Sequence, residues 1–196
     1  MEAKINSINL KTEALKNGAI WGVISLVIFL AVWYTAPDFM VSWAYSGISF
    51  VIGITLAIFF TLDLRKKAGG YWSFSEALWT IFVMFILAAV ISYSFSILFG
   101  KFIDTSYPTT MKESIMAKTE TFMKDMNVGD AEIEEALSKQ EGDLDKQFNP
   151  NFGQAIVGFG ITAIVFFIGA LIFALIFKRS NPNPFVDQDQ FAQPSS

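Results

Sequence analysis

The carboxylates are the side chains to which chemistry could be assigned, because the sequence contains neither histidine nor cysteine. Their absence removes the usual proton carrier near neutral pH, the commonest metal ligand and the thiol nucleophile. Glu76 stands just before a long apolar run, where a carboxylate could exchange protons or act as a general base. A serine nucleophile would need a neighbouring base, and none is visible in the sequence.

The densest acidic clusters are Glu132, Glu134 and Glu135, followed by Asp143 and Asp145. A calcium-binding loop requires an Asp-x-Asp-x-Asp-Gly arrangement, which neither cluster has. We therefore expect these carboxylates to lie on solvated helix faces. The sequence predicts no catalytic, cofactor-binding or metal-binding residues and no cofactor.

Four long runs without a charged side chain are the elements that would have to position a carboxylate or serine with a chemical role. They cover residues 18–36, 39–62, 77–100 and 152–177. At about 1.5 Å per helical residue, each run can cross a hydrocarbon layer of about 30 Å. Residues 81–87 do not alternate as the strands of a membrane β-barrel would. The sequence predicts an all-α membrane protein with four transmembrane helices in one domain, residues 1–180, and a disordered polar tail, residues 181–196.

Small residues recur at four-residue steps inside three of these runs. The sets are Gly18 with Gly22, Gly158 with Thr162, and Ser92 with Ser96 and Gly100. Such ridges let helix backbones approach closely, so we expect them to face other helices. A hydroxyl-lined ion path is the alternative interpretation.

Lysine and arginine near the span ends predict the orientation. Basic residues occupy the N-terminal tail, residues 65–67 and residues 178–179, whereas the first connection has none. Both termini are therefore predicted to be cytoplasmic and residues 101–151 extracytoplasmic. Residues 65–67 are interpreted as anchors of this orientation rather than as a dedicated anionic-lipid site. Aromatic residues near the span ends, among them Trp33, Trp43, Trp72 and Trp79, are interpreted as anchors at the membrane interfaces.

The connection before the third run contains Ser73 and Glu76 at the spacing of a capping box. In that motif each side chain satisfies a free backbone donor at the start of the helix. Residues 152–155 resemble residues 74–77 in sequence, and shared helix-start chemistry explains this more simply than an inverted repeat does.

The third connection is predicted to fold as an amphipathic helical hairpin over residues 108–148. Thr110 and Glu113 have capping-box spacing at its start, and Asn127 and Gly129 fit a turn between two helices. Apolar residues recur at three- and four-residue steps, including Met111 and Ile115 in the first helix. This methionine-rich stripe could bind a partner, or it could pack on its own neighbour or on the membrane surface.

Several segments carry a family resemblance. They are Asn-Gly-Ala-Ile-Trp-Gly at residues 17–22, Arg-Lys-Lys-Ala-Gly-Gly-Tyr-Trp-Ser-Phe-Ser-Glu-Ala at residues 65–77, and Asn-Val-Gly-Asp-Ala-Glu-Ile-Glu at residues 127–134. Together they resemble the domain-of-unknown-function family forty-one ninety-nine, over nearly the whole chain. The resemblance implies a small four-span inner-membrane protein of Gram-negative bacteria. It transfers no site residues, because the family carries no established activity.

The expected function is that of a non-enzymatic envelope scaffold or accessory subunit in the bacterial inner membrane. Its expected partners are the lipid bilayer, a protein bound through residues 108–148 and a second copy of the chain, with no nucleic acid. The alternative is a small oligomeric transporter or channel. An enzyme is the weakest class, because the spans carry no ionisable group at depth.

Overall fold

The computed structural model describes residues 2–180, with side chains from residue 9 onward. Within these residues it is helical, without a named strand. The polar tail predicted for residues 181–196 lies outside the described residues. In chain order the elements are α1 (Glu2–Thr35), the 3-10 helix η1 (Pro37–Val41), α2 (Trp43–Lys67), α3 (Phe74–Leu98), the π-helical turn η2 (Phe99–Ile103), α4 (Tyr107–Asp125), α5 (Asp130–Phe148) and α6 (Phe152–Phe177).

Four of the described helices are long and apolar enough to cross a membrane. They are Asn9–Thr35, Trp43–Lys67, Phe74–Ile103 and Phe152–Phe177. Each corresponds to one of the predicted runs, so the chain is an all-α, multi-pass membrane protein.

The start of the second span differs from the prediction. Residues 39–41 belong to η1, which begins at Pro37, and α2 begins only at Trp43. The side chain of Ser42 accepts a hydrogen bond from the backbone N of Tyr45 at 3.0 Å and so caps α2. The hydropathy of the sequence does not reveal where α2 begins, because the capping residue Ser42 lies among apolar residues.

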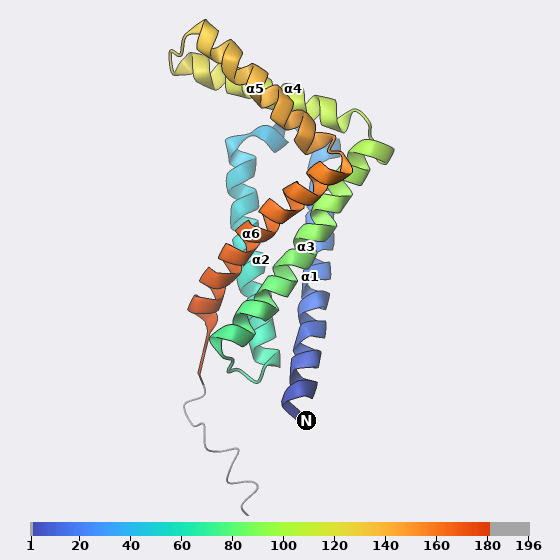
Figure 1. Ribbon diagram of the computed structural model, residues 1–196, viewed down its shortest axis with the longest axis vertical. Coiled ribbons are helices and arrows are strands. Elements are labelled where there is room, and N and C mark those ends of the chain that lie inside the picture. The colour runs from blue at the N-terminus through green and yellow to red at the C-terminus, as the bar shows by residue number, and fades with distance from the viewer. Residues whose placement is uncertain (1, 181–196) are drawn as a thin grey trace, which may run out of the picture.

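Glycines allow α1 to lie directly against α3 (Figure 1). A Cβ atom built on Gly18 would lie 2.6 Å from the carbonyl oxygen of Met84, and one built on Gly22 would lie 2.9 Å from Ile91. These two glycines therefore face another helix, as the small-residue spacing predicted. The Gly158 ridge of α6 likewise faces α3, because a Cβ there would lie 2.5 Å from the hydroxyl of Tyr93.

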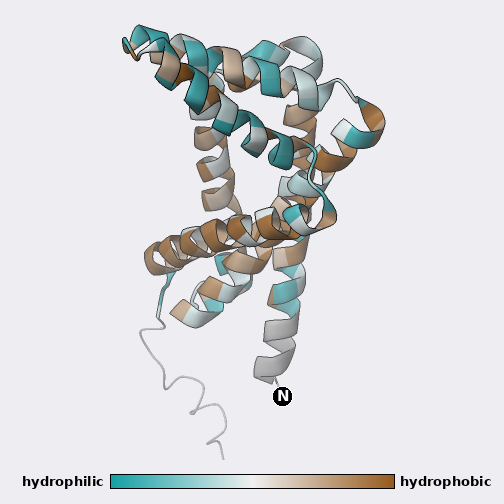
Figure 2. Ribbon diagram, turned by 45° about the horizontal axis from the view of Figure 1, so that its top comes forward, coloured by the Kyte–Doolittle hydropathy of each residue, from teal (hydrophilic) through white to brown (hydrophobic). Residues whose placement is uncertain are grey.

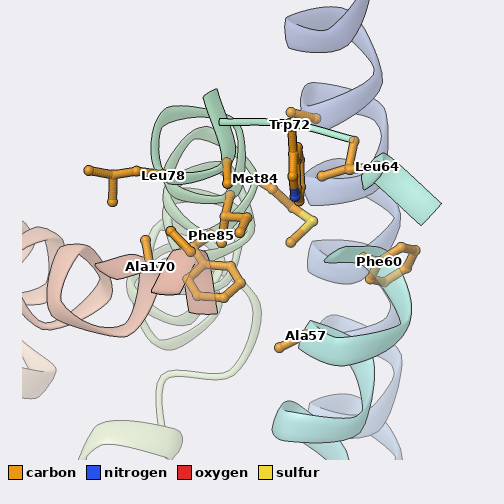
Figure 3. Close-up of a cluster of buried hydrophobic side chains, with 12 residues drawn as sticks. Ala57, Phe60, Leu64, Trp72, Leu78, Met84, Phe85 and Ala170 are labelled. Atoms are coloured by element: carbon orange, nitrogen blue, oxygen red, sulfur yellow. The ribbon is translucent and has the colours of Figure 1, made fainter. Parts of the chain in front are cut away.

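The main core lies around α3, against which α1, α2 and α6 contribute buried side chains (Figure 3). Phe60 and Leu64 of α2 pack into the same cluster as Met84 and Phe85 of α3 and Ala170 of α6. The buried residues of α2 all lie between positions 57 and 64, towards its C-terminal end. Elsewhere α2 presents exposed apolar side chains, as a lipid-facing helix does.

The helices α4 and α5 form a hairpin beyond one end of the spans (Figure 1). The start of α1, the α2–α3 turn and the end of α6 lie at the opposite end. Figure 2 shows the hairpin as largely hydrophilic and the spans as largely hydrophobic. Lys112 of α4 binds Glu141 at 2.8 Å and Asp145 at 2.9 Å, which joins the two helices.

One detail of the predicted hairpin is wrong. The first helix begins at Tyr107, so Thr110 lies inside it and does not form a capping box with Glu113. The backbone N of Thr110 already donates to the carbonyl of Ser106 at 2.9 Å. Pro108, the second residue of the helix, favours this earlier start, because its fixed φ suits the first turn and its missing N–H is not needed there. The predicted turn is present, with Asn127 in the left-handed region at φ 58°.

Candidate functional site

A cluster of charged side chains joins α1 to α2 at the end of the bundle opposite the hairpin. We call it the Glu13 cluster; its members are Glu13, Lys16, Asn17, Asp63 and Lys67. The ammonium of Lys67 lies 2.7 Å from Oε2 of Glu13 and 2.8 Å from Oδ2 of Asp63. Lys16 binds the other oxygen of Glu13 at 2.6 Å. The amide of Asn17, which is only 4% exposed, donates to Asp63 at 2.8 Å.

The members of this cluster differ in their exposure to solvent. The carboxylates of Glu13 and Asp63 retain 19% and 33% exposure, and Lys67 retains 38%. Ion pairs with this exposure contribute little individually, because water screens them. The buried amide of Asn17 matters more, since removal of its partner would leave a polar group without a hydrogen bond. The cluster therefore fixes the register of α1 against α2.

Only part of this cluster can be predicted from the sequence. Asp63 and Lys67 stand one helical turn apart, so that pair could have been anticipated. Glu13 lies 54 residues from Lys67 in the chain. Only the packing of α1 on α2 brings the two together.

A pocket of about 360 Å³ lies beside the Glu13 cluster. Its walls include Lys11, Lys67 and Trp79, and Glu76 lies on its lining. The carboxylate of Glu76, however, is engaged in a capping box. Its Oε2 accepts from the backbone N of Ser73 at 2.9 Å and from the Ser73 hydroxyl at 2.8 Å. The hydroxyl of Ser73 accepts from the backbone N of Glu76 at 3.2 Å, so the predicted capping box is confirmed.

The start of α6 uses the same chemistry. The side chain of Asn151 accepts from the backbone N of Gln154, and the side chain of Gln154 accepts from the backbone N of Asn151, both at 2.9 Å. The sequence likeness between residues 74–77 and 152–155 thus coincides with two capping boxes. Shared helix-start chemistry accounts for it.

Two of the tryptophans interpreted as membrane anchors have another role. Trp72 is 3% exposed, and its indole N–H donates to the carbonyl of Phe177 at 2.9 Å. The backbones of Trp72 and Arg179 exchange hydrogen bonds at 3.0 and 3.2 Å, so the α2–α3 turn is joined to the end of α6. Trp33 is 6% exposed and belongs to a second buried cluster, at the hairpin end of the bundle, with Phe99 and Tyr107. The interpretation of Trp33 and Trp72 as interface anchors is therefore wrong, whereas Trp43 is 84% exposed as an anchor would be.

Asp104 is the carboxylate at the hairpin end of the bundle that carries the most hydrogen bonds. It accepts from the Ser106 hydroxyl at 2.6 Å, from the Ser106 backbone N at 3.1 Å and from the indole of Trp33 at 2.9 Å. These bonds, with that of the Ser106 hydroxyl foremost, hold the pKa of Asp104 below its ordinary value. Asp104 thus fixes the turn that precedes α4 to the end of α1.

The base of the hairpin is anchored in an aromatic cluster. The ring of Tyr107 lies 5.1 Å from that of Trp33 and 5.7 Å from that of Phe148, measured between centroids, and both pairs are edge-to-face. The hydroxyl of Tyr107 lies 3.3 Å from that of Ser96, and burial raises the pKa of Tyr107. A Cβ on Gly100 would lie 2.9 Å from Pro108. Ser96 and Gly100 therefore face α4, as the ridge spacing predicted for a helix contact.

The sequence matches the family DUF4199, a protein family of unknown function, over residues 16–179. The chain belongs to this family. No curated protein and no solved structure matches it.

The DUF4199 segment contains all of α2 to α6 and most of the first span. It includes both capping boxes, Asp104 and the aromatic base of the hairpin. It begins at Lys16, so Glu13 lies just before it.

The acidic clusters of this DUF4199 chain lie on the hairpin surface. Glu135 binds Lys139, Asp143 binds Lys146, and Asp145 binds Lys112. Among the residues that the structure describes, no three potential ligands come together in a geometry suited to a metal ion. Glu76, Glu135, Asp143 and Asp145 therefore occupy ion pairs or a helix cap, whereas Glu132 and Glu134 are exposed on the surface of α5.

Proposed function

We propose that this protein is a non-enzymatic scaffold or accessory subunit of the bacterial inner membrane, with both termini cytoplasmic and the hairpin outside. The hairpin is its interaction surface for a protein partner. The observation that carries this proposal is that the hairpin extends beyond the spans on a fixed base (Figure 1). Tyr107 and Met111 are 6% and 8% exposed in that base, so the orientation of the hairpin is set before any partner binds.

Charge supports a protein partner with a basic surface. Residues 101–151 contain six lysines and eleven acids, a net charge of −5. Glu132 and Glu134 of α5 are exposed, and neither has an ion pair among the described residues. An acidic helix face on a rigid support attracts a basic partner and orients it.

The non-enzymatic assignment is supported by the engagement of the carboxylates. Glu13 and Asp63 are bridged by Lys67, and Glu76 caps a helix. A general base must reach a substrate proton, and each of these carboxylates has at least one oxygen that already accepts from a protein donor.

Site-specific photocrosslinking in living cells tests the proposal. A photoreactive residue at Glu134 should yield a discrete adduct, while one at Ile164, which is 63% exposed on α6, serves as the lipid-facing control. The charge reversal Glu132→Lys should abolish the adduct without altering thermal stability, because Glu132 is exposed and has no ion pair among the described residues. An adduct of twice the chain mass would identify a second copy as the partner.

The alternative, a small oligomeric transporter or channel, is tested with purified protein in liposomes. A proton or solute flux that Glu76→Gln abolishes, with the fold intact, would replace the scaffold proposal with proton-linked transport. Absence of an adduct at Glu134 and at further exposed α5 positions would also overturn the scaffold proposal.

A further inference from the structure

A groove lies between the hairpin and the adjacent ends of the spans, and we call it the hairpin groove. Its volume is about 500 Å³, which falls within the usual range of ligand pockets of roughly 300–1,000 Å³. Its walls come from α1, η1, α2, α3 and both hairpin helices. Most of the side chains that form it are apolar, including Phe29, Met40, Met111, Ile115, Phe122 and Phe148.

The mouth of the groove lies at the level where α2 enters its span. Trp43, the first residue of α2, is 84% exposed and lines the groove. Phe122 of α4 is 51% exposed, and its ring lies 6.5 Å from that of Trp43. Tryptophan at a span end marks the membrane interface. An apolar chain could therefore pass from the adjoining leaflet into the groove without crossing water.

Lys118 is the only basic residue among the described residues that line the groove. The other lysines of the hairpin helices, Lys112, Lys124, Lys139 and Lys146, each bind a carboxylate. Lys118 lines the groove and makes no ion pair or hydrogen bond within the part of the chain whose side chains are described. The described lining contains no acidic residue. The hairpin has more acids than lysines. The groove nevertheless offers an anion one lysine, Lys118, that no carboxylate among the described residues neutralises.

We propose that the hairpin groove binds the acyl chain of an anionic lipid from the leaflet on the hairpin side, with the headgroup beside Lys118. Methionine and aromatic side chains adapt to a flexible hydrocarbon chain. An ammonium group at the rim selects a phosphate or carboxylate headgroup over a zwitterionic one. The access from the membrane and the lone lysine favour a lipid over a soluble ligand or a peptide. This site is independent of the protein partner proposed above.

Photolabelling of the full-length protein in vesicles tests the assignment. The probe is phosphatidylglycerol with a diazirine near the end of one acyl chain, in vesicles of phosphatidylcholine. Adducts are mapped by mass spectrometry and expressed relative to adducts on the lipid-facing residues Ile161 and Ile164 of α6, which are 60% and 63% exposed. We expect enrichment on residues 111–122, and weaker enrichment with a phosphatidylcholine probe.

Two variants and a control make the test specific. Lys118→Gln should lower the preference for the anionic probe about fivefold, the effect of one lysine near a membrane surface. Lys124→Gln should leave labelling unchanged, because Lys124 is paired with Glu120 and does not line the groove. Ile115→Trp should fill the groove and remove its adducts, while thermal stability reports whether that variant still folds.

The outcomes separate clearly. Labelling restricted to the lipid-facing surfaces of the spans would overturn the proposal. Groove labelling that is equal for both probes and unchanged by Lys118→Gln would overturn it as well. In living cells, a photoreactive residue at position 115 that crosslinked to another protein chain, and not to lipid, would also overturn the proposal.

Discussion

The contact of Gly18 with α3 gives the sharpest prediction for the membrane-spanning part. A Cβ at this position would lie 2.6 Å from the carbonyl oxygen of Met84 and 3.3 Å from its carbonyl carbon. Both are backbone atoms and cannot rotate away as a side chain could. Gly18→Ala must therefore push α1 away from α3, at an overpacking cost of about 1–3 kcal/mol.

Helix propensity acts in the opposite direction and needs a matched control. Alanine is more favourable than glycine in a helix by about 0.5–1 kcal/mol. Gly160 of α6 provides the control, because a Cβ there meets nothing within 4 Å. Gly160→Ala gains the same propensity without the clash, so the difference between the two variants isolates the packing cost.

Thermal unfolding of the purified protein in detergent measures this difference. For a chain of this size, 1 kcal/mol corresponds to about 2–4 °C in Tm, so Gly18→Ala should melt roughly 2–12 °C below Gly160→Ala. Tryptophan fluorescence is a suitable signal, since Trp21 lies one turn from Gly18 on the same helix. Equal melting temperatures for the two variants would show that α1 and α3 do not touch at Gly18.

Three further predictions concern topology, capping and pH. A cysteine introduced at Ser138 should react with an impermeant maleimide in spheroplasts while one at Ser180 should not; the reverse pattern would invert the proposed orientation. Glu76→Gln should leave stability nearly unchanged because the amide oxygen can still accept, whereas Glu76→Ala should cost about 1 kcal/mol in denaturant unfolding; equal losses would contradict the capping role. The lowered pKa of Asp104 means that its carboxylate stabilises the fold above its ordinary pKa of about 3.9, and that this contribution disappears as pH falls through the lower folded-state pKa. Asp104→Asn should therefore reduce the loss of Tm between pH 5 and pH 2; parallel curves for the two proteins would refute this.

Local features of the sequence were sufficient for the spans, the capping boxes and the hairpin turn. A segment in lipid must satisfy its backbone hydrogen bonds within its own helix, so length and hydropathy alone reveal it. The Ser73–Glu76 box and the turn at Asn127 depend on residues at most a few positions apart. The start of α4 was misplaced because Thr110 and Glu113 satisfy the same spacing rule, whereas the helix begins at Tyr107 with Pro108 in its first turn.

The tertiary structure decided which polar and aromatic side chains meet. Trp33 and Trp72 have the composition and position of interface anchors, yet packing buries them and gives their indoles the partners Asp104 and Phe177. The Glu13 cluster and the hairpin groove likewise join elements distant in sequence. A periodic apolar pattern shows which residues avoid water but is the same whether they face lipid or protein, because both environments are apolar. The amino-acid sequence therefore determined the membrane helices of this protein, and only their packing determined its ion pairs, its buried tryptophans and its groove.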